Sequence, residues 1–138
     1  MTSRKLLDTD TMFDKLVSDA APDGVTPIRD TEPDSYGELP LVAWNAINGG
    51  QYDHGLWRIT LSLNVVAEPL TIFSICSDLY SAITLWNVPG EGVMPGIGGV
   101  LEVNDSNVFA KVGGDVLLHG KHLAQYVATF TISVKEMT

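Results

Sequence analysis

The sequence is short of positive charge and has a single cysteine. Its 8 Lys and Arg residues stand against 17 Asp and Glu, which gives a formal net charge of −9 at pH 7. Proteins that grip a nucleic-acid backbone need clustered cations, so this composition argues against binding to DNA or RNA, although DNA could still slide past. Cys76 has no partner for an intramolecular disulfide, and its apolar neighbours predict a small buried side chain in preference to a reactive thiol.

Long hydrophobic runs are also absent. No stretch approaches the roughly 18 uncharged apolar residues of a membrane span. The N-terminal residues MTSRKLLDTDTMFD reach acidic side chains before any apolar segment of useful length, which argues against a secretory signal. We therefore expect a soluble protein of a reducing compartment, or of a particle assembled there. The 138 residues, 45% hydrophobic and 18% charged, predict one globular domain.

Motifs for catalysis, cofactors and metals are missing as well. The sequence contains no GxSxG, SxxK or HExxH, and its spacings do not assemble a nucleophile, a base and an orienting group. Asp30, Glu32 and Asp34 lie close together, but an EF-hand would need Gly and Glu where Ser35 and Leu41 stand. We interpret them as a solvated acidic loop, with a weak adventitious metal site as the alternative. No catalytic, cofactor or metal site is predicted, and the chain is not expected to be an enzyme.

Two segments alternate between apolar and polar side chains, which is typical of strands with one buried face. Their apolar positions are Trp57, Ile59, Leu61, Leu63 and Val65 in the first, and Tyr126, Ala128, Phe130, Ile132 and Val134 in the second. We expect both in one sheet, with the Thr129, Thr131 and Ser133 face of the second left for solvent, a channel or a neighbouring subunit. Shorter strands are predicted over residues 25–29, 39–48, 100–103, 108–112 and 116–118, with a turn at NDSN, residues 104–107.

Two other segments carry apolar residues at helical spacing. In residues 10–20, Thr11 and Asp14 resemble a capping box, and Asp8 and Asp10 also fit helix capping. Residues 69–87 begin at Pro69, which suits a first helical turn, and the apolar stripe that follows is Ile72, Ile75, Cys76, Leu79, Ile83 and Trp86. The patterns together predict an α+β fold: a single mostly antiparallel sheet, one long helix packed on one face and a short N-terminal helix.

A stretch rich in glycine and proline, NVPGEGVMPGIGGV, occupies residues 87–100. Its spacing matches neither the GxGxxG nor the GxxxxGK[ST] pattern of phosphate-binding loops. We interpret it as a loop that is either simply flexible or orders against a neighbouring copy. The residues of this candidate assembly loop are Pro89, Gly90, Gly92, Met94, Pro95, Gly96, Gly98 and Gly99.

The order of these elements resembles that of the tail terminator proteins of long-tailed bacteriophages. The similarity is strongest in a strand, LSLNVVAEP, that runs into a helix over residues 61–85, and in a last strand, YVATFTISVKE, centred on aromatic residues. An N-terminal helix, a short strand and an acidic, Pro-containing loop precede them. The resemblance therefore covers most of the chain.

This resemblance implies a structural role. Members of the family form a ring, usually a hexamer, on the head-proximal end of the tail tube, where they stop tube growth and offer a docking face to the head connector. It implies a homo-oligomer in the virion tail, assembled in the host cytoplasm, whose partners are the tail tube protein and a head-tail connector or stopper protein. DNA would pass through without sequence-specific binding, and no membrane is involved. The alternatives are another head-to-tail joining protein, or a small ligand-binding domain or enzyme with a pocket of convergent polar groups.

Overall fold

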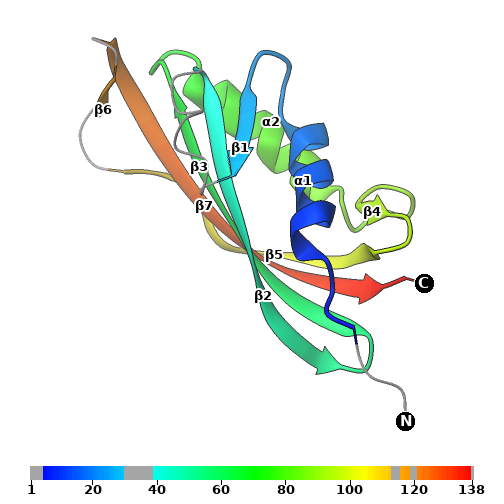
Figure 1. Ribbon diagram of the computed structural model, residues 1–138. Coiled ribbons are helices and arrows are strands. Elements are labelled where there is room, and N and C mark those ends of the chain that lie inside the picture. The colour runs from blue at the N-terminus through cyan, green and yellow to red at the C-terminus, as the bar shows by residue number, and fades with distance from the viewer. Residues whose placement is uncertain (1–4, 30–38, 113–115, 119–120, 138) are drawn as a thin grey trace.

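The computed structural model describes residues 5–29, 39–112, 116–118 and 121–137 (Figure 1). Its helices are α1 (Thr9–Ala20) and α2 (Ile72–Thr84). Its strands are β1 (Thr26–Arg29), β2 (Leu41–Asp53), β3 (Leu56–Ala67), β4 (Val93–Met94), β5 (Gly98–Lys111), β6 (Val116–Leu118) and β7 (Lys121–Glu136). The fold is α+β, as the sequence predicts.

The strands form one twisted sheet in the order β1-β2-β3-β7-β5-β4, and β6 pairs with β7 beyond the end of β5 (Figure 1). The two long alternating segments lie side by side as β3 and β7, antiparallel, with Leu61 opposite Phe130. The sheet is mixed, because β1 runs parallel to β2 and places Ile28 opposite Ala43. Alternation predicts which face a strand buries, but it carries no information on strand direction, so the parallel pair was not foreseen.

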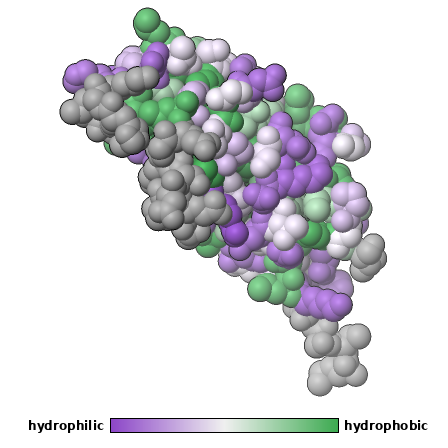
Figure 2. Space-filling view, turned by 45° about the horizontal axis from the view of Figure 1, so that its top comes forward, coloured by the Kyte–Doolittle hydropathy of each residue, from purple (hydrophilic) through white to green (hydrophobic). Residues whose placement is uncertain are grey.

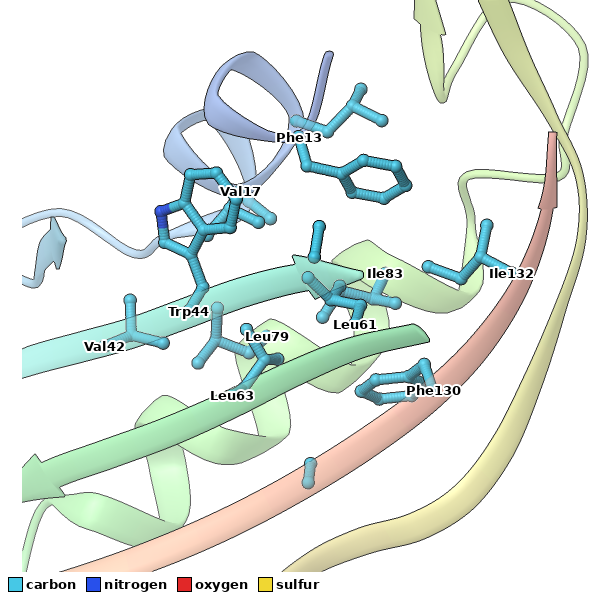
Figure 3. Packing of buried hydrophobic residues seen from close by; sticks show 14 of the residues in the cluster. Phe13, Val17, Val42, Trp44, Leu61, Leu63, Leu79, Ile83, Phe130 and Ile132 are labelled. Carbon is cyan, nitrogen blue, oxygen red and sulfur yellow. The ribbon is translucent and has the colours of Figure 1, made fainter. Parts of the chain in front are cut away.

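Both helices pack on the same face of the sheet, where their apolar stripes meet the inward side chains of β2, β3 and β7. Figure 3 shows Leu79 and Ile83 of α2 near Leu61 and Phe130. Burying each such side chain contributes roughly 1.5–3 kcal/mol, so the predicted stripes account for much of the core. The core includes all three tryptophans, Trp44, Trp57 and Trp86, and the apolar patterns predicted this for Trp57 and Trp86.

Both helices lie where they were predicted, but α2 is shorter than the predicted residues 69–87. With 13 residues, α2 is hardly longer than α1, which has 12, so the predicted single long helix is not found. Pro69 lies in a turn, where the Thr71 amide donates to the Glu68 carbonyl at 3.0 Å, and the helix begins after this turn. At the other end the Leu85 and Trp86 amides donate to carbonyls only three residues back, which closes the helix.

The start of α1 is capped by Asp8. Its carboxylate accepts hydrogen bonds from the Thr11 amide at 3.2 Å and from the Thr11 hydroxyl at 2.8 Å. The capping role predicted for Asp8 is confirmed, whereas the predicted box of Thr11 with Asp14 is wrong, because Thr11 lies inside the helix. Asp10, in the first turn, forms an ion pair of 2.6 Å with Arg29 and so ties α1 to β1.

Two strands continue through residues that the sequence placed in turns. β2 runs past Gly49 and Gly50 to Asp53, with shifts in its register against β3. β5 begins at Gly98 and continues through the predicted NDSN turn, absorbing the extra residues as register shifts against β7. Such β-bulges keep turn-forming residues inside a sheet, which explains why the two predicted short strands are one.

The two edges of the described sheet differ. At one edge the Thr26 amide of β1 donates to the Pro40 carbonyl at 3.0 Å, so the next nitrogen, that of Pro27, faces away from β2 and has no hydrogen to donate. At the other edge β4 covers only the first two residues of β5. The rest of β5 carries bulges and exposed charges, among them Glu102 and Lys111, which make it a poor template for another strand.

Candidate functional site

The candidate assembly loop is packed against the core over part of its length. Gly92 is buried, its amide donates to the Trp86 carbonyl at 3.1 Å, and a Cβ atom on it would lie 2.6 Å from the Trp86 Cβ. Gly98 is also buried, and a Cβ atom there would lie 2.9 Å from a Val134 methyl. Among the candidate residues, those exposed are Pro89, Gly90, Pro95 and Gly96, while Met94 and Gly99 are half-buried. Only part of the segment is therefore open to a neighbour.

The candidate acidic loop of Asp30, Glu32 and Asp34 lies outside the described residues. Within the described ranges, no group of three or more His, Cys, Asp or Glu side chains is arranged to hold a metal ion. The same part of the chain has no helix long and apolar enough to cross a membrane. Cys76 is buried, as predicted, and burial raises the pKa of its thiol to about 12. The thiol therefore stays protonated at neutral pH and is a poor nucleophile.

An open groove of about 630 Å³ lies where the loop after α1, the start of β2 and the turn between β3 and α2 meet. Its floor is apolar and buried, and it consists of Val25, Ala67, Ile75 and Leu123. In Figure 1 this end of the molecule is at the top, where the loop between α1 and β1 approaches the start of α2. We call this feature the acidic groove, because of its rim.

The rim of the acidic groove carries three exposed carboxylates, Asp23, Glu68 and Asp78, and the described lining residues include no Lys or Arg. Leu70 also lines the groove and is 98% exposed, and Phe73, close by on the first turn of α2, is 73% exposed. Figure 2 shows hydrophobic atoms at the surface at this end, between hydrophilic ones. An apolar floor with a carboxylate rim is suited to recognising an apolar side chain that carries a cation beside it.

The sequence did not reveal the acidic groove, because its residues come from separate segments that only the fold brings together. One signal was available. Leu70 and Phe73 do not belong to the buried stripe of α2, and large apolar side chains that the core does not use point to a contact surface.

The opposite end of the molecule carries the segment that precedes α1 (Figure 1, bottom). Leu7 anchors this segment in the core, being only 5% exposed. Leu6 is 79% exposed and Lys5 is exposed beside it. The two ends of one molecule therefore differ in chemistry: one offers an apolar floor with carboxylates, the other an exposed apolar side chain with a cation, near the carboxylates of Asp8 and Glu136.

The face of the sheet that points away from the helices is polar along β3 and β7. Its positions are Arg58, Thr60, Ser62 and Asn64 on β3, flanked by the apolar Leu56 and Val66, and Gln125, Val127, Thr129, Thr131, Ser133 and Lys135 on β7. The Gln125 side-chain Nε2 donates to the Asn64 side-chain oxygen at 2.8 Å. Thr129 and Thr131 are half-exposed here as expected, whereas Ser133 is buried. None of these positions is a carboxylate, although the exposed Glu102 of the neighbouring β5 lies opposite Ser133.

No protein-family model matches the chain, and no curated protein matches it in sequence. A function must therefore be argued from the surfaces described above and from the pattern of the sequence.

Proposed function

We propose that this chain is a structural virion protein, a tail terminator that forms a ring on the head-proximal end of a phage tail tube. The observation that carries the proposal is the pair of unlike surfaces at opposite ends of one small molecule: the acidic groove and the segment with Lys5 and Leu6. A ring needs unlike surfaces, because each subunit presents one patch to one neighbour and a different patch to the other.

Two further features support this role. The order of elements resembles that of the tail terminator family, with one strand running into a helix and a long last strand. Among the positions named above, the polar face of β3 and β7 carries hydroxyls and amides with two cations, Arg58 and Lys135. Such a face would not hold a phosphate backbone firmly, which suits a ring through which DNA passes. In this proposal the ring stops tube polymerisation and presents a docking face to the head connector.

The test is to polymerise the tail tube protein encoded with this chain, with and without the chain present. Analytical ultracentrifugation gives the oligomeric state of the chain alone, and electron microscopy gives tube lengths and the position of bound protein. We expect a ring that binds one end of each tube and shortens the tubes. A compact monomer that leaves tube length unchanged would overturn the proposal, and binding to the connector but not to tubes would favour a stopper or adaptor.

The acidic groove also favours a second candidate, a small ligand-binding α+β domain, since about 630 Å³ is within the range of ligand sites. Its three carboxylates would select an apolar amine. A panel of aliphatic and aromatic amines tested by thermal shift separates the two candidates. A micromolar ligand for a monomeric protein would favour the binding domain.

A further inference from the structure

We infer that the acidic groove of one copy receives the N-terminal segment of the next copy, with Lys5 at the carboxylate rim and Leu6 on the apolar floor. The inference rests on the ring of the proposed function and assigns the contact that builds it. It makes the contact head-to-tail, because the groove and the segment lie at opposite ends of the molecule (Figure 1).

The groove defines the chemistry of its occupant. The floor is formed by buried apolar side chains, among them Ile75 and Leu123, and it is open to solvent between Glu68 and Asp78. An occupant that leaves these carboxylates unpaired would gain little, while a cation beside an apolar side chain satisfies both parts of the surface. Leu70, almost fully exposed at the edge of the groove, provides further apolar area to cover.

The chain itself contains such an occupant. Lys5 is exposed next to Leu6, which is 79% exposed, and Arg4 precedes them in the sequence. Lys111 beside Val112 is another exposed cation next to an apolar residue, but Lys111 belongs to β5 and Val112 is only 41% exposed. The segment before α1 belongs to no strand, and the anchored Leu7 follows Lys5 and Leu6, so both lie outside the sheet.

The segment cannot fill the groove of its own molecule. Leu7 is fixed in the core beside α1 and holds the adjoining Lys5 and Leu6 at this end, whereas the groove lies at the far end of the molecule. A second copy is therefore the occupant that fits. Contacts between unlike patches of identical copies close into a ring when the rotation between neighbours closes, and otherwise give an open filament.

Charge reversal tests this contact. One variant reverses the segment (Arg4→Glu with Lys5→Glu), and a second reverses the groove (Glu68→Lys with Asp78→Lys). Each variant alone places like charges at every contact, so we expect monomers and at least about tenfold weaker association by sedimentation. Mixed in equal amounts, the two variants place opposite charges at both kinds of contact, and we expect rings in which they alternate. A chain that carries all four substitutions should also form rings, because its segment and its groove again have opposite charges.

Two controls keep the result specific. Circular dichroism and thermal unfolding show that each variant is folded, and Lys111→Glu removes a cation from β5 without touching the contact, so it should leave the ring intact. Rings formed by the segment-reversed variant alone would overturn the inference, as would a failure of the mixture to restore association between folded variants. Loss of tube binding without loss of the ring in the groove-reversed variant would also overturn it, because the groove would then serve another protein.

The outcomes separate this inference from the proposed function. A ring that caps tubes and survives charge reversal leaves the proposed function standing and removes the inference. A ring that is lost and restored by charge reversal as expected, but does not bind tail tubes, supports the inference and refutes the proposed function. A wild-type chain that stays monomeric with and without tubes refutes both.

Discussion

The Tyr80 hydroxyl of α2 donates a hydrogen bond of 2.6 Å to the Asp105 carboxylate of β5. This bond links the helix layer to the strand at the edge of the sheet, and the Tyr80 ring also lies 6.3 Å from the ring of Phe130. The hydrogen bond, with smaller contributions from desolvation and from the charge of Asp105, raises the pKa of Tyr80 above its ordinary value.

We predict that Asp105→Ala lowers the pKa of Tyr80, because the acceptor that favours the protonated hydroxyl is lost. The measurement is an absorbance titration of the phenol groups, in which Tyr80→Phe identifies the contribution of Tyr80. Glu102→Ala removes a different carboxylate from the same strand and should leave the titration unchanged. Equal titration curves for wild type and Asp105→Ala would show that the bond does not persist in solution.

We predict that Gly92→Ala destabilises the protein by about 1–3 kcal/mol, the usual cost of overpacking a well-packed site. The added Cβ would lie 2.6 Å from the Trp86 Cβ and 2.7 Å from the Trp86 carbonyl oxygen. Gly99→Ala is a matched control, because its Cβ would meet only ordinary contacts, at 3.5 Å or more. Urea unfolding of both variants measures the difference, and equal stabilities would contradict the packing of this segment against Trp86.

We predict that Asp8→Ala lowers the free energy of unfolding by about 1 kcal/mol, since the Thr11 amide at the start of α1 loses its acceptor. Asp14→Ala, six residues further along the chain, changes an exposed carboxylate with no capping role and should have a much smaller effect. Thermal unfolding of the two variants distinguishes the observed cap from the capping box that the sequence suggested. A larger loss of stability for Asp14→Ala than for Asp8→Ala would contradict the Asp8 cap and favour the predicted capping box.

We predict that alkaline pH destabilises the fold through Cys76. Burial raises the pKa of its thiol from 9.0 to about 12, so the folded state keeps the proton where the unfolded state has lost it. The resulting stability is fully present below about pH 9 and declines as the pH rises toward 12. Urea unfolding should show a steeper decline for wild type than for Cys76→Ala over this range. Parallel curves for the two proteins would show that the thiol does not contribute.

Much of the core was predictable because burial leaves a periodic trace in the sequence. The alternation of Trp57 to Val65 and the stripe of Ile72 to Ile83 are confirmed, residue by residue, by burial. Element ends were predicted less well, because they depend on single hydrogen bonds. Asp8 replaced Thr11 as the cap, and Pro69 lies in a turn before α2 instead of in its first turn.

The groove was not predictable, since proximity between distant segments has no local signature. Asp23 and Asp78 are 55 positions apart in the sequence. Both line one groove because β3 leads into α2 beside the loop that follows α1. The exposed Leu70 and Phe73 were visible in the sequence as apolar residues off the stripe. That both side chains are exposed, and so available for a contact, is seen only in the structure.

Pro27 on the outer side of β1 has a consequence for how copies can associate. A sheet that could add a strand at both edges would let molecules stack edge to edge without limit, as fibres do. At the edge formed by β1, a proline nitrogen interrupts the row of donors, and at the other edge the bulges of β5 break the regular spacing. Neither edge of the described sheet is therefore a ready template for a further strand, and copies of a protein proposed to end one polymer would meet through side chains instead.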